Sequence, residues 1–190
     1  IVWEQAVGAN VLDADGNRYV DLTSGFGVAL VGHRNPHVVR AVHQQSQRLL
    51  HAMGDAWPDT KRIEFLDALN DYIPGNLEVS LLGLSGSDAV DAAIKTAILK
   101  TGKKGVLTFE GGYHGLSLGV LPLQGYKAAF TDPFRSIVNP NVYRLPFGCP
   151  MDDIKQLLRS QDIGLVLVEP ILGRGGMLPP PSGWLQELSS

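Results

Sequence analysis

Near the start of the chain, two short stretches of alternating apolar and polar residues predict a pair of β-strands. They cover residues 10–14 and 17–22, and Asp15 and Gly16 lie at the turn between them. An Asp-Gly pair in this place is typical of a type I′ turn, in which both central residues have positive φ. We therefore expect a β-hairpin, followed by a Gly-rich loop over residues 23–32.

Apolar residues spaced three or four apart predict two helices after this loop. The first begins with Asn35 as its N-cap and Pro36 at its first position, and both residues are favoured there. The second covers residues 59–73 and ends before Pro74 and Gly75. The residues expected to pack inward are Val38, Val42, Leu49 and Met53 on the first helix, and Ile63, Leu66, Leu69 and Ile73 on the second.

From about residue 78 the pattern changes to strands that alternate with helices. Three apolar runs without alternation are typical of strands covered on both faces of a parallel sheet. These runs are 79–84, 106–109 and 163–168. Helices are predicted over 85–100, 152–159 and 183–190. The alternation indicates βαβ units, so we expect an α/β fold with a mostly parallel, doubly wound sheet and flanking helices. The pattern assigns nothing to residues 119–150.

Composition and charge exclude several classes of protein. The 190 residues include 16 Lys and Arg against 19 Asp and Glu, for a formal charge of -3, and the basic residues form no run. Neither nucleic acid nor a membrane is therefore an expected partner, and no stretch reaches the ~20 apolar residues of a membrane span. The single Cys149 excludes an internal disulfide and a CxxC metal site, which fits a cytoplasmic protein.

Ser85, Gly86 and Ser87 lie where a predicted strand ends and a helix begins. Unpaired N–H groups and the positive end of the helix dipole meet at such a point, and both favour an anion. Glycine lets the backbone approach a phosphate, and serine hydroxyls add donors. The alternative is an ordinary N-cap, with Asp88 in the first helical turn. A Walker motif and a GxGxxG sequence after a strand are both absent.

Two further segments follow predicted strands, and ligands of open α/β sheets bind outside the carboxyl ends of strands. One segment contains Tyr113, whose flat ring suits stacking on a planar ligand, although packing on the core is the alternative. The other contains Glu169, whose carboxylate is expected to point into the same crevice; a cap or a salt bridge is its alternative role. A Gly-rich loop with Arg174 follows.

Residues 115–119 match the GxSxG nucleophile motif of α/β-hydrolases, with Ser117 as the serine. In those enzymes the serine directly follows its strand and the histidine comes later. Here five residues separate Phe109 from Gly115, and all five His residues precede Ser117, so we expect no hydrolase. His33 and His37 have the i, i+4 spacing of metal ligands but no accompanying carboxylate motif, so no metal site is expected.

Four segments together resemble the class III, fold-type I aminotransferases that use pyridoxal 5′-phosphate (PLP), the group of acetylornithine, ornithine and 4-aminobutyrate aminotransferases. The segments are 15–22 with 32–36, 85–95, 109–115 and 168–173. The resemblance covers nearly the whole chain and implies the fold of PLP-dependent transferases. It places residues 1–55, the hairpin, loop and first helix, in the small domain. Residues 56–190 are then the N-terminal part of the PLP-binding large domain.

The resemblance also implies roles for single residues. The cofactor-binding residues it implies are Ser85, Gly86, Ser87, Tyr113, His114, Gly115 and Glu169. Among them, Gly86 and Ser87 hold the phosphate, and Tyr113 stacks on the pyridine ring. Phe26 and Trp57 are implied on the substrate side. Arg174 stands where ornithine and 4-aminobutyrate enzymes carry a gating Glu, and it is a candidate for binding a substrate carboxylate.

In this group the residues that define the chemistry lie downstream of the Glu-Pro strand. They are an Asp that pairs with the pyridine nitrogen and the Lys that forms the Schiff base. No Lys of this chain has a matching context, and Lys95 lies two helical turns past the phosphate site. No catalytic residue is therefore assigned, and the chain is expected to be the N-terminal portion of a longer enzyme, inactive alone.

The expected reaction of the complete enzyme is transfer of an amino group from an amine or amino acid to a keto acid, by ping-pong chemistry through PLP and pyridoxamine phosphate. The resemblance implies a homodimer with its site at the interface. Two alternatives stay open. One is a racemase or mutase on the same scaffold, and the other is a non-catalytic remnant or regulatory domain that binds an organic phosphate.

Overall fold

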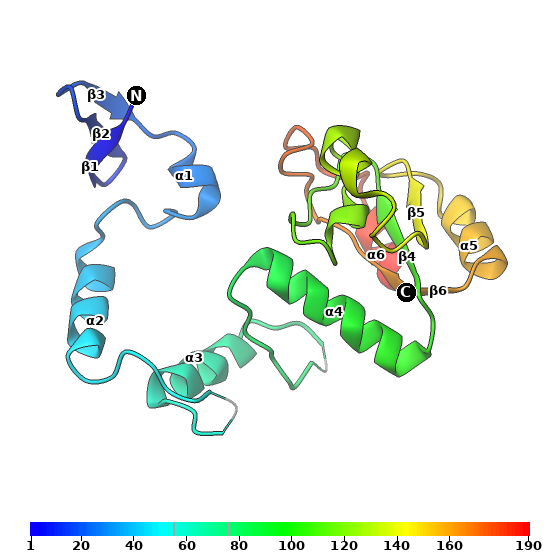
Figure 1. Cartoon of the computed structure of the whole chain (residues 1–190), viewed down its shortest axis with the longest axis horizontal. Helices are drawn as coiled ribbons and strands as arrows, with labels where there is room; N and C mark the ends of the chain where they lie inside the picture. Colours follow the sequence, from blue (N-terminus) through cyan, green and yellow to red (C-terminus); the bar gives the residue numbers. More distant parts are fainter. Residues whose placement is uncertain (55, 76) are drawn as a thin grey trace. The chain divides into compact units, whose positions relative to one another are not determined.

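The computed structural model describes residues 1–54, 56–75 and 77–190. The chain forms two compact units, Ile1–Glu78 and Val79–Ser190, and each is described by itself (Figure 1). The domain boundary that the sequence predicts between residues 55 and 56 stays a prediction, and residue 55 lies outside the described residues.

The first unit begins with an antiparallel sheet in the order β1 (Trp3–Val7), β2 (Asn10–Asp13), β3 (Arg18–Val20). Strands β2 and β3 confirm the predicted hairpin, whereas the sequence pattern does not predict β1. The predicted type I′ turn is wrong, because Gly16 has positive φ (84°) and Asp15 does not. Asp13 organises the turn instead: its carboxylate accepts the N–H groups of Asp15 and Asn17 at 3.1 and 2.8 Å.

The Gly-rich loop contains a left-handed turn, α1 (Ser24–Gly27). Its four residues have positive φ, with Ser24 at 51° and Phe26 at 59°. This conformation costs an L-residue roughly 1–2 kcal/mol. The carboxylate of Asp21 holds the turn, since it accepts the N–H of Gly25 at 2.9 Å and bonds to His33 Nε2 at 2.8 Å. The bond to His33 is the main reason that the pKa of Asp21 falls to about 2.

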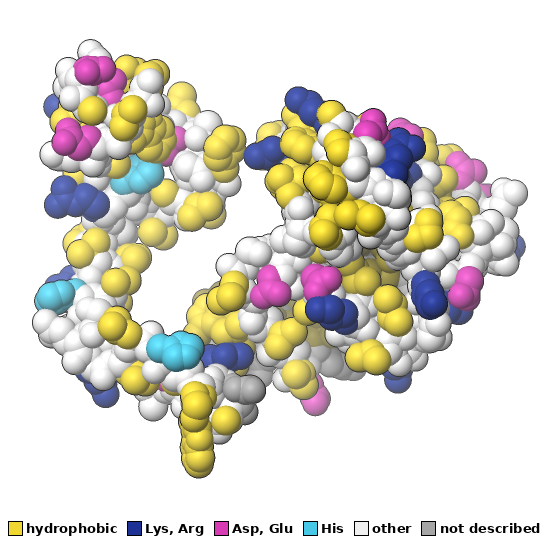
Figure 2. All heavy atoms as spheres, viewed as in Figure 1, with side chains coloured by type: hydrophobic (Ala, Val, Ile, Leu, Met, Phe, Trp, Pro, Cys, Tyr) yellow, Lys and Arg dark blue, Asp and Glu magenta, His cyan; other side chains and the backbone are white. Residues whose placement is uncertain are grey.

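Two helices complete the first unit, α2 (Pro36–Ser46) and α3 (Thr60–Asn70), and both are predicted by the sequence. Asn35 caps α2 as expected, accepting the N–H of His37 at 3.0 Å. The predicted inward face of α2 is wrong, because Val38, Val42, Leu49 and Met53 are exposed, and Figure 2 shows many hydrophobic side chains at the surface. Ile63 on α3 is exposed as well, whereas Leu66, Leu69 and Ile73 are half-buried. Periodicity identifies an apolar face but not the element that covers it.

The second unit is built on a parallel sheet in the order β5-β4-β6, as the α/β prediction requires. Its strands are β4 (Gly105–Phe109), β5 (Val142–Leu145) and β6 (Ile163–Val166). Along β4 successive side chains face opposite sides, so Val106 packs with α4 (Gly86–Thr101), while Leu107 packs with α5 (Met151–Ser160) and α6 (Trp184–Ser189). Figure 1 shows β4 in the middle of this layered unit.

Short 3₁₀ turns occupy much of the region that the pattern leaves unassigned: η1 (Leu121–Leu123), η2 (Ala128–Phe130) and η3 (Asp132–Phe134).

The predicted strand over residues 79–84 is wrong for this structure. Val79, Leu81 and Leu84 are 92%, 69% and 101% exposed, and the segment joins no described sheet. A strand that is apolar on both faces needs covering layers and neighbours on its edges. The described residues supply neither to this segment.

The core on the α5 and α6 side is aromatic. The ring centroid of Trp184 lies 5.1 Å from that of Phe109 and 5.5 Å from that of Phe147. The indole N–H of Trp184 donates to the carbonyl of Cys149 at 2.8 Å, which satisfies its one polar group.

Cys149 is a free thiol, and burial raises its pKa. Among the described residues, no helix is long and apolar enough to cross a membrane.

Replacing Leu107 with Ala is expected to destabilise the second unit. Leu107 is 0% exposed at the centre of the sheet, so the substitution leaves a cavity and lowers the free energy of unfolding by about 2–5 kcal/mol. Urea denaturation measures the loss. Leu158→Ala on α5 is the matched control, because Leu158 is 40% exposed and should lose much less. Equal losses would contradict this description of the core.

Candidate functional site

The N-terminus of α4 presents backbone donors to open space. Ser85 is the N-cap, and its Oγ accepts the N–H of Asp88 at 3.2 Å. The Asp88 carboxylate accepts the N–H of Leu84 at 2.9 Å. Within the described part of the chain, the N–H groups of Gly86 and Ser87 have no acceptor. No neighbouring atom lies within 4 Å of the position a Cβ on Gly86 would take. Two such donors at a helix start suit an anion.

The loop after β4 packs closely on this helix start. A Cβ on Gly115 would lie only 2.5 Å from Ser87 Oγ, and Gly115 has a φ of 122°, so no other residue fits there without displacement. The loop brings Ser117 to Ser87: the two hydroxyl oxygens are 2.7 Å apart, and the Ser117 N–H donates to Ser87 Oγ at 3.2 Å. A shallow hollow of about 270 Å³ lies here. It is lined by Ser85, Ser87, Asp88, Asp91, Ser117 and Gly119.

Glu169 joins the two loops that follow β4 and β6. Its Oε1 accepts the N–H of Tyr113 at 2.6 Å, and its Oε2 accepts the N–H of Gly173 at 3.0 Å. The next residue, Arg174, places its guanidinium carbon 4.4 Å from the ring centroid of Tyr113. Such a contact is an attractive cation–π geometry. The structure therefore brings Tyr113, Glu169 and Arg174 together, and their roles toward a cofactor or substrate stay predictions.

His114 points back toward the sheet. Its Nε2 lies 3.1 Å from Thr108 Oγ1, and Thr108 also donates to the carbonyl of Leu123 at 3.3 Å. Burial lowers the pKa of His114, and the nearby charge of Glu169 partly opposes this. Because the hydroxyl proton of Thr108 goes to Leu123, its oxygen accepts from His114, whose ring then carries a proton on Nε2.

Gln124 supports the same loop from the core. It is 3% exposed, and its side-chain N–H donates to the carbonyl of Gly115. Its buried Oε1 has no partner among the described residues. The loop carrying Tyr113, His114 and Gly115 is thus held by Glu169, Thr108 and Gln124.

Phe26 and Trp57 belong to the first unit, and their substrate-side role stays a prediction. Phe26 is 89% exposed and Trp57 is 70% exposed. His33 bonds to Asp21, and no group of three or more His, Cys, Asp or Glu side chains suited to a metal ion occurs among the residues that the structure describes.

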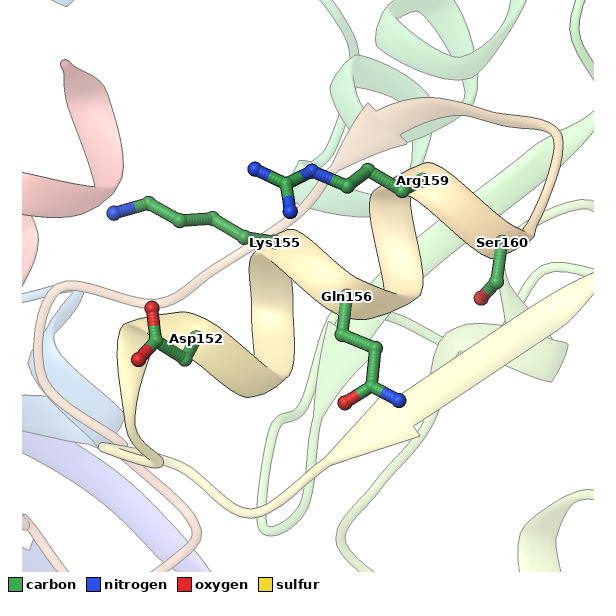
Figure 3. A pocket seen from close by; sticks show the side chains of 5 residues that line it. All are labelled: Asp152, Lys155, Gln156, Arg159 and Ser160. Atoms are coloured by element: carbon green, nitrogen blue, oxygen red, sulfur yellow. The ribbon is translucent and has the colours of Figure 1, made fainter.

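A larger hollow, of about 480 Å³, lies on the outer surface of α5 (Figure 3). It is lined by Asp152, Lys155, Gln156, Arg159 and Ser160, all from one helix. Figure 3 shows the side chains of Lys155 and Arg159 extending from the helix, and Lys155 Nζ lies 3.7 Å from Oε1 of Glu187 on α6. One exposed helix face cannot enclose a ligand, so we assign no site there.

Three residues of the site are not among those predicted from the sequence. Ser117 is visible in the sequence only through the GxSxG match, which suggests another chemistry. Thr108 looks like an ordinary strand residue, and nothing in the sequence distinguishes Gln124. Their roles depend on contacts between segments 6 to 30 residues apart.

Comparison with known proteins identifies the family of the chain. The sequence model of the family "Aminotransferase class-III" matches residues 1–190. The chain is 36% identical to acetylornithine aminotransferase of Methanopyrus kandleri, covering 95% of this chain and 45% of that protein. It is 32% identical to 2-aminoadipate transaminase of Pseudomonas putida, covering 95% and 46%. The chain thus spans about half the length of these relatives.

Solved structures share the fold. A thermostable (S)-enantioselective omega-transaminase from Thermomicrobium roseum superposes with a TM-score of 0.87 at 23% identity, covering 100% of this chain and 48% of that one. Ornithine aminotransferase from Toxoplasma gondii gives a TM-score of 0.85 at 22% identity, covering 100% and 45%. That structure is described as having PLP at partial occupancy in its active site. At these identities the likeness concerns the fold alone.

The lowered pKa of His114 makes the stability of the protein depend on pH. In the unfolded chain His114 takes up a proton near its ordinary pKa of 6.5, whereas the folded form takes it up at lower pH. The unfolded state then binds more protons, so stability falls as the pH drops below about 6.5, until the folded pKa is reached. NMR titration of the ring should give a midpoint below 6.5. A midpoint at or above 6.5 would contradict the buried, neutral imidazole.

Proposed function

Because the chain belongs to the class-III aminotransferases, we propose that the start of α4 holds the phosphate of PLP, the cofactor of this family. The complete enzyme then transfers an amino group from an amine or amino acid to a keto acid. The observation that carries the proposal is the meeting of three segments: the helix start at Gly86 and Ser87, the loop at Tyr113–Gly115, and Glu169.

The residues present fit the phosphate of this cofactor. Two N–H donors without acceptors in the described chain, and a hydroxyl beside them, match phosphate oxygens, which only accept hydrogen bonds. The space in front of Gly86 is the space that a Cβ would begin to fill. A dianion there also interacts favourably with the positive end of a 16-residue helix.

When bound, PLP supplies an electron sink that stabilises negative charge on a substrate carbon. The chain's own residues orient and surround it. Tyr113 offers a half-buried ring for stacking, and Glu169 fixes the backbone of that tyrosine at 2.6 Å. His114, neutral through burial, shapes the loop without adding charge.

Arg174 is proposed to bind the carboxylate of a substrate. Its guanidinium is held next to Tyr113, 4.4 Å from the ring centroid, at the edge of the same site. Arg pairs with a carboxylate through two parallel hydrogen bonds, which the single ammonium group of a Lys does not provide. An acidic donor or acceptor is therefore favoured over a simple amine.

The catalytic lysine is proposed to come from another part of the enzyme. Lys95, the lysine nearest in sequence to the phosphate site, pairs with Asp91 at 2.5 Å and is exposed.

We also propose a homodimer with its site at the interface. In support, residues near the left-handed turn form an exposed apolar run, as surfaces that meet a partner do. The run comprises Phe26, Val28, Leu30 and Val31.

Ser87→Ala tests the phosphate assignment. The substitution removes a charge-assisted hydrogen bond, so binding of pyridoxamine 5′-phosphate should weaken by roughly 1.5–3 kcal/mol. Calorimetric titration measures it, and this form of the cofactor avoids the reaction of an aldehyde with surface lysines. Ser160→Ala on α5 is the control and should bind as the wild type does. An unchanged affinity of the Ser87 variant would refute the assignment.

A further inference from the structure

Ser117 has a hydroxyl that the proposed function does not yet use. It is the serine of the GxSxG match, and such a nucleophile needs a base within about 2.6–3.2 Å. The nearest histidine in sequence, His114, directs its Nε2 to Thr108 instead. The polar partner of Ser117 is Ser87, through two contacts of 2.7 and 3.2 Å. Ser117 therefore contacts the start of α4 and lacks, among the described residues, the base that a nucleophile needs.

The hydrogen-bond count at this pair leaves one proton for an outside acceptor. A serine oxygen accepts two hydrogen bonds and donates one. Ser87 Oγ already accepts the N–H of Ser117. If the Ser117 hydroxyl also donates to it, both acceptor positions are filled and the Ser87 O–H must point outward. If the Ser87 hydroxyl instead donates to Ser117 Oγ, the Ser117 O–H is the donor without an acceptor in the pair. Either way the pair presents a donor, which matches an anion.

Backbone packing fixes the pair in place. Gly115, two residues before Ser117, presses against Ser87 so closely that a Cβ would overlap its side chain. Gln124 holds the carbonyl of Gly115 from the buried side. Ser117 is therefore delivered to Ser87 by a loop anchored in the core.

Two carboxylates line the same hollow and oppose an anion there. Both are engaged: Asp88 accepts the N–H of Leu84 at 2.9 Å, and Asp91 pairs with Lys95 at 2.5 Å. The donors that face the anion must contribute more than the repulsion from these two carboxylates. A Ser87 hydroxyl that points its proton at the anion adds one such donor.

We propose that Ser117 is a positioning residue of the phosphate site, acting through Ser87. Its N–H and hydroxyl occupy the acceptor positions of Ser87 Oγ, so that the Ser87 O–H donates to the phosphate. The inference rests on the proposed function and extends it to a residue outside the motif that carries the resemblance.

The test compares two probes that differ only in the phosphate: pyridoxamine 5′-phosphate and pyridoxamine. Calorimetric titration of the 190-residue chain gives both affinities. Ser117→Ala should weaken binding of the phosphorylated probe roughly tenfold and leave pyridoxamine unchanged. Ser117→Thr keeps the N–H and the hydroxyl and should restore at least half of the lost preference. Circular dichroism checks that each variant folds.

A double variant separates positioning from an independent contact. If Ser117 acts through Ser87, then Ser87→Ala with Ser117→Ala should lose no more affinity than Ser87→Ala alone. Additive losses would overturn the positioning role, as would an equal loss for both probes in Ser117→Ala. A wild-type chain that does not prefer the phosphorylated probe would refute the proposed function itself. A preference lost in Ser87→Ala but kept in Ser117→Ala would overturn this inference alone.

Discussion

Parallel pairing of β4 with β6 is the constraint on which the site depends. Parallel strands end at the same edge of a sheet, so the segments after Phe109 and after Val166 must emerge together. Glu169 then ties the two segments with one carboxylate, bonded to the N–H groups of Tyr113 and Gly173. Without the common edge, the carboxylate of Glu169 would have no reason to lie beside Tyr113, 56 positions earlier in the chain.

The helix start supplies the other half of the arrangement. The capping of α4 by Ser85 and Asp88 uses the N–H groups of Asp88 and Leu84 and leaves those of Gly86 and Ser87 without acceptors in the described chain. A cap and a binding site therefore coexist, because they use different donors of the same turn. The close approach of Gly115 then adds hydroxyl groups to those backbone donors.

Local signals in the sequence predicted much of this fold. Caps and terminators located α2 and α4 through Asn35, Ser85 and Gly102, because their effect is confined to neighbouring residues. Apolar runs located β4 and β6 for the same reason. The turn type at Asp15-Gly16 was wrong because the carboxylate of Asp13, a residue outside the dipeptide, decides the geometry.

Features that depend on residues far apart in the sequence could not be predicted from local patterns. The run 79–84 has the composition of a buried strand but finds no partner strand among the described residues. Of the site, Ser87, Tyr113 and Glu169 could be proposed because they follow strands or open a helix. Ser117 could not, since its position depends on the buried contact of Gln124 with Gly115.

The most direct test of the account is a titration of the ¹⁵N-labelled chain with pyridoxamine 5′-phosphate, followed by amide NMR. If the start of α4 binds the phosphate, the largest shifts must occur at the N–H groups of Gly86 and Ser87, whose hydrogens gain an anionic acceptor. If the largest shifts instead occur around Lys155 and Arg159 on α5, with Gly86 and Ser87 unchanged, the account is contradicted.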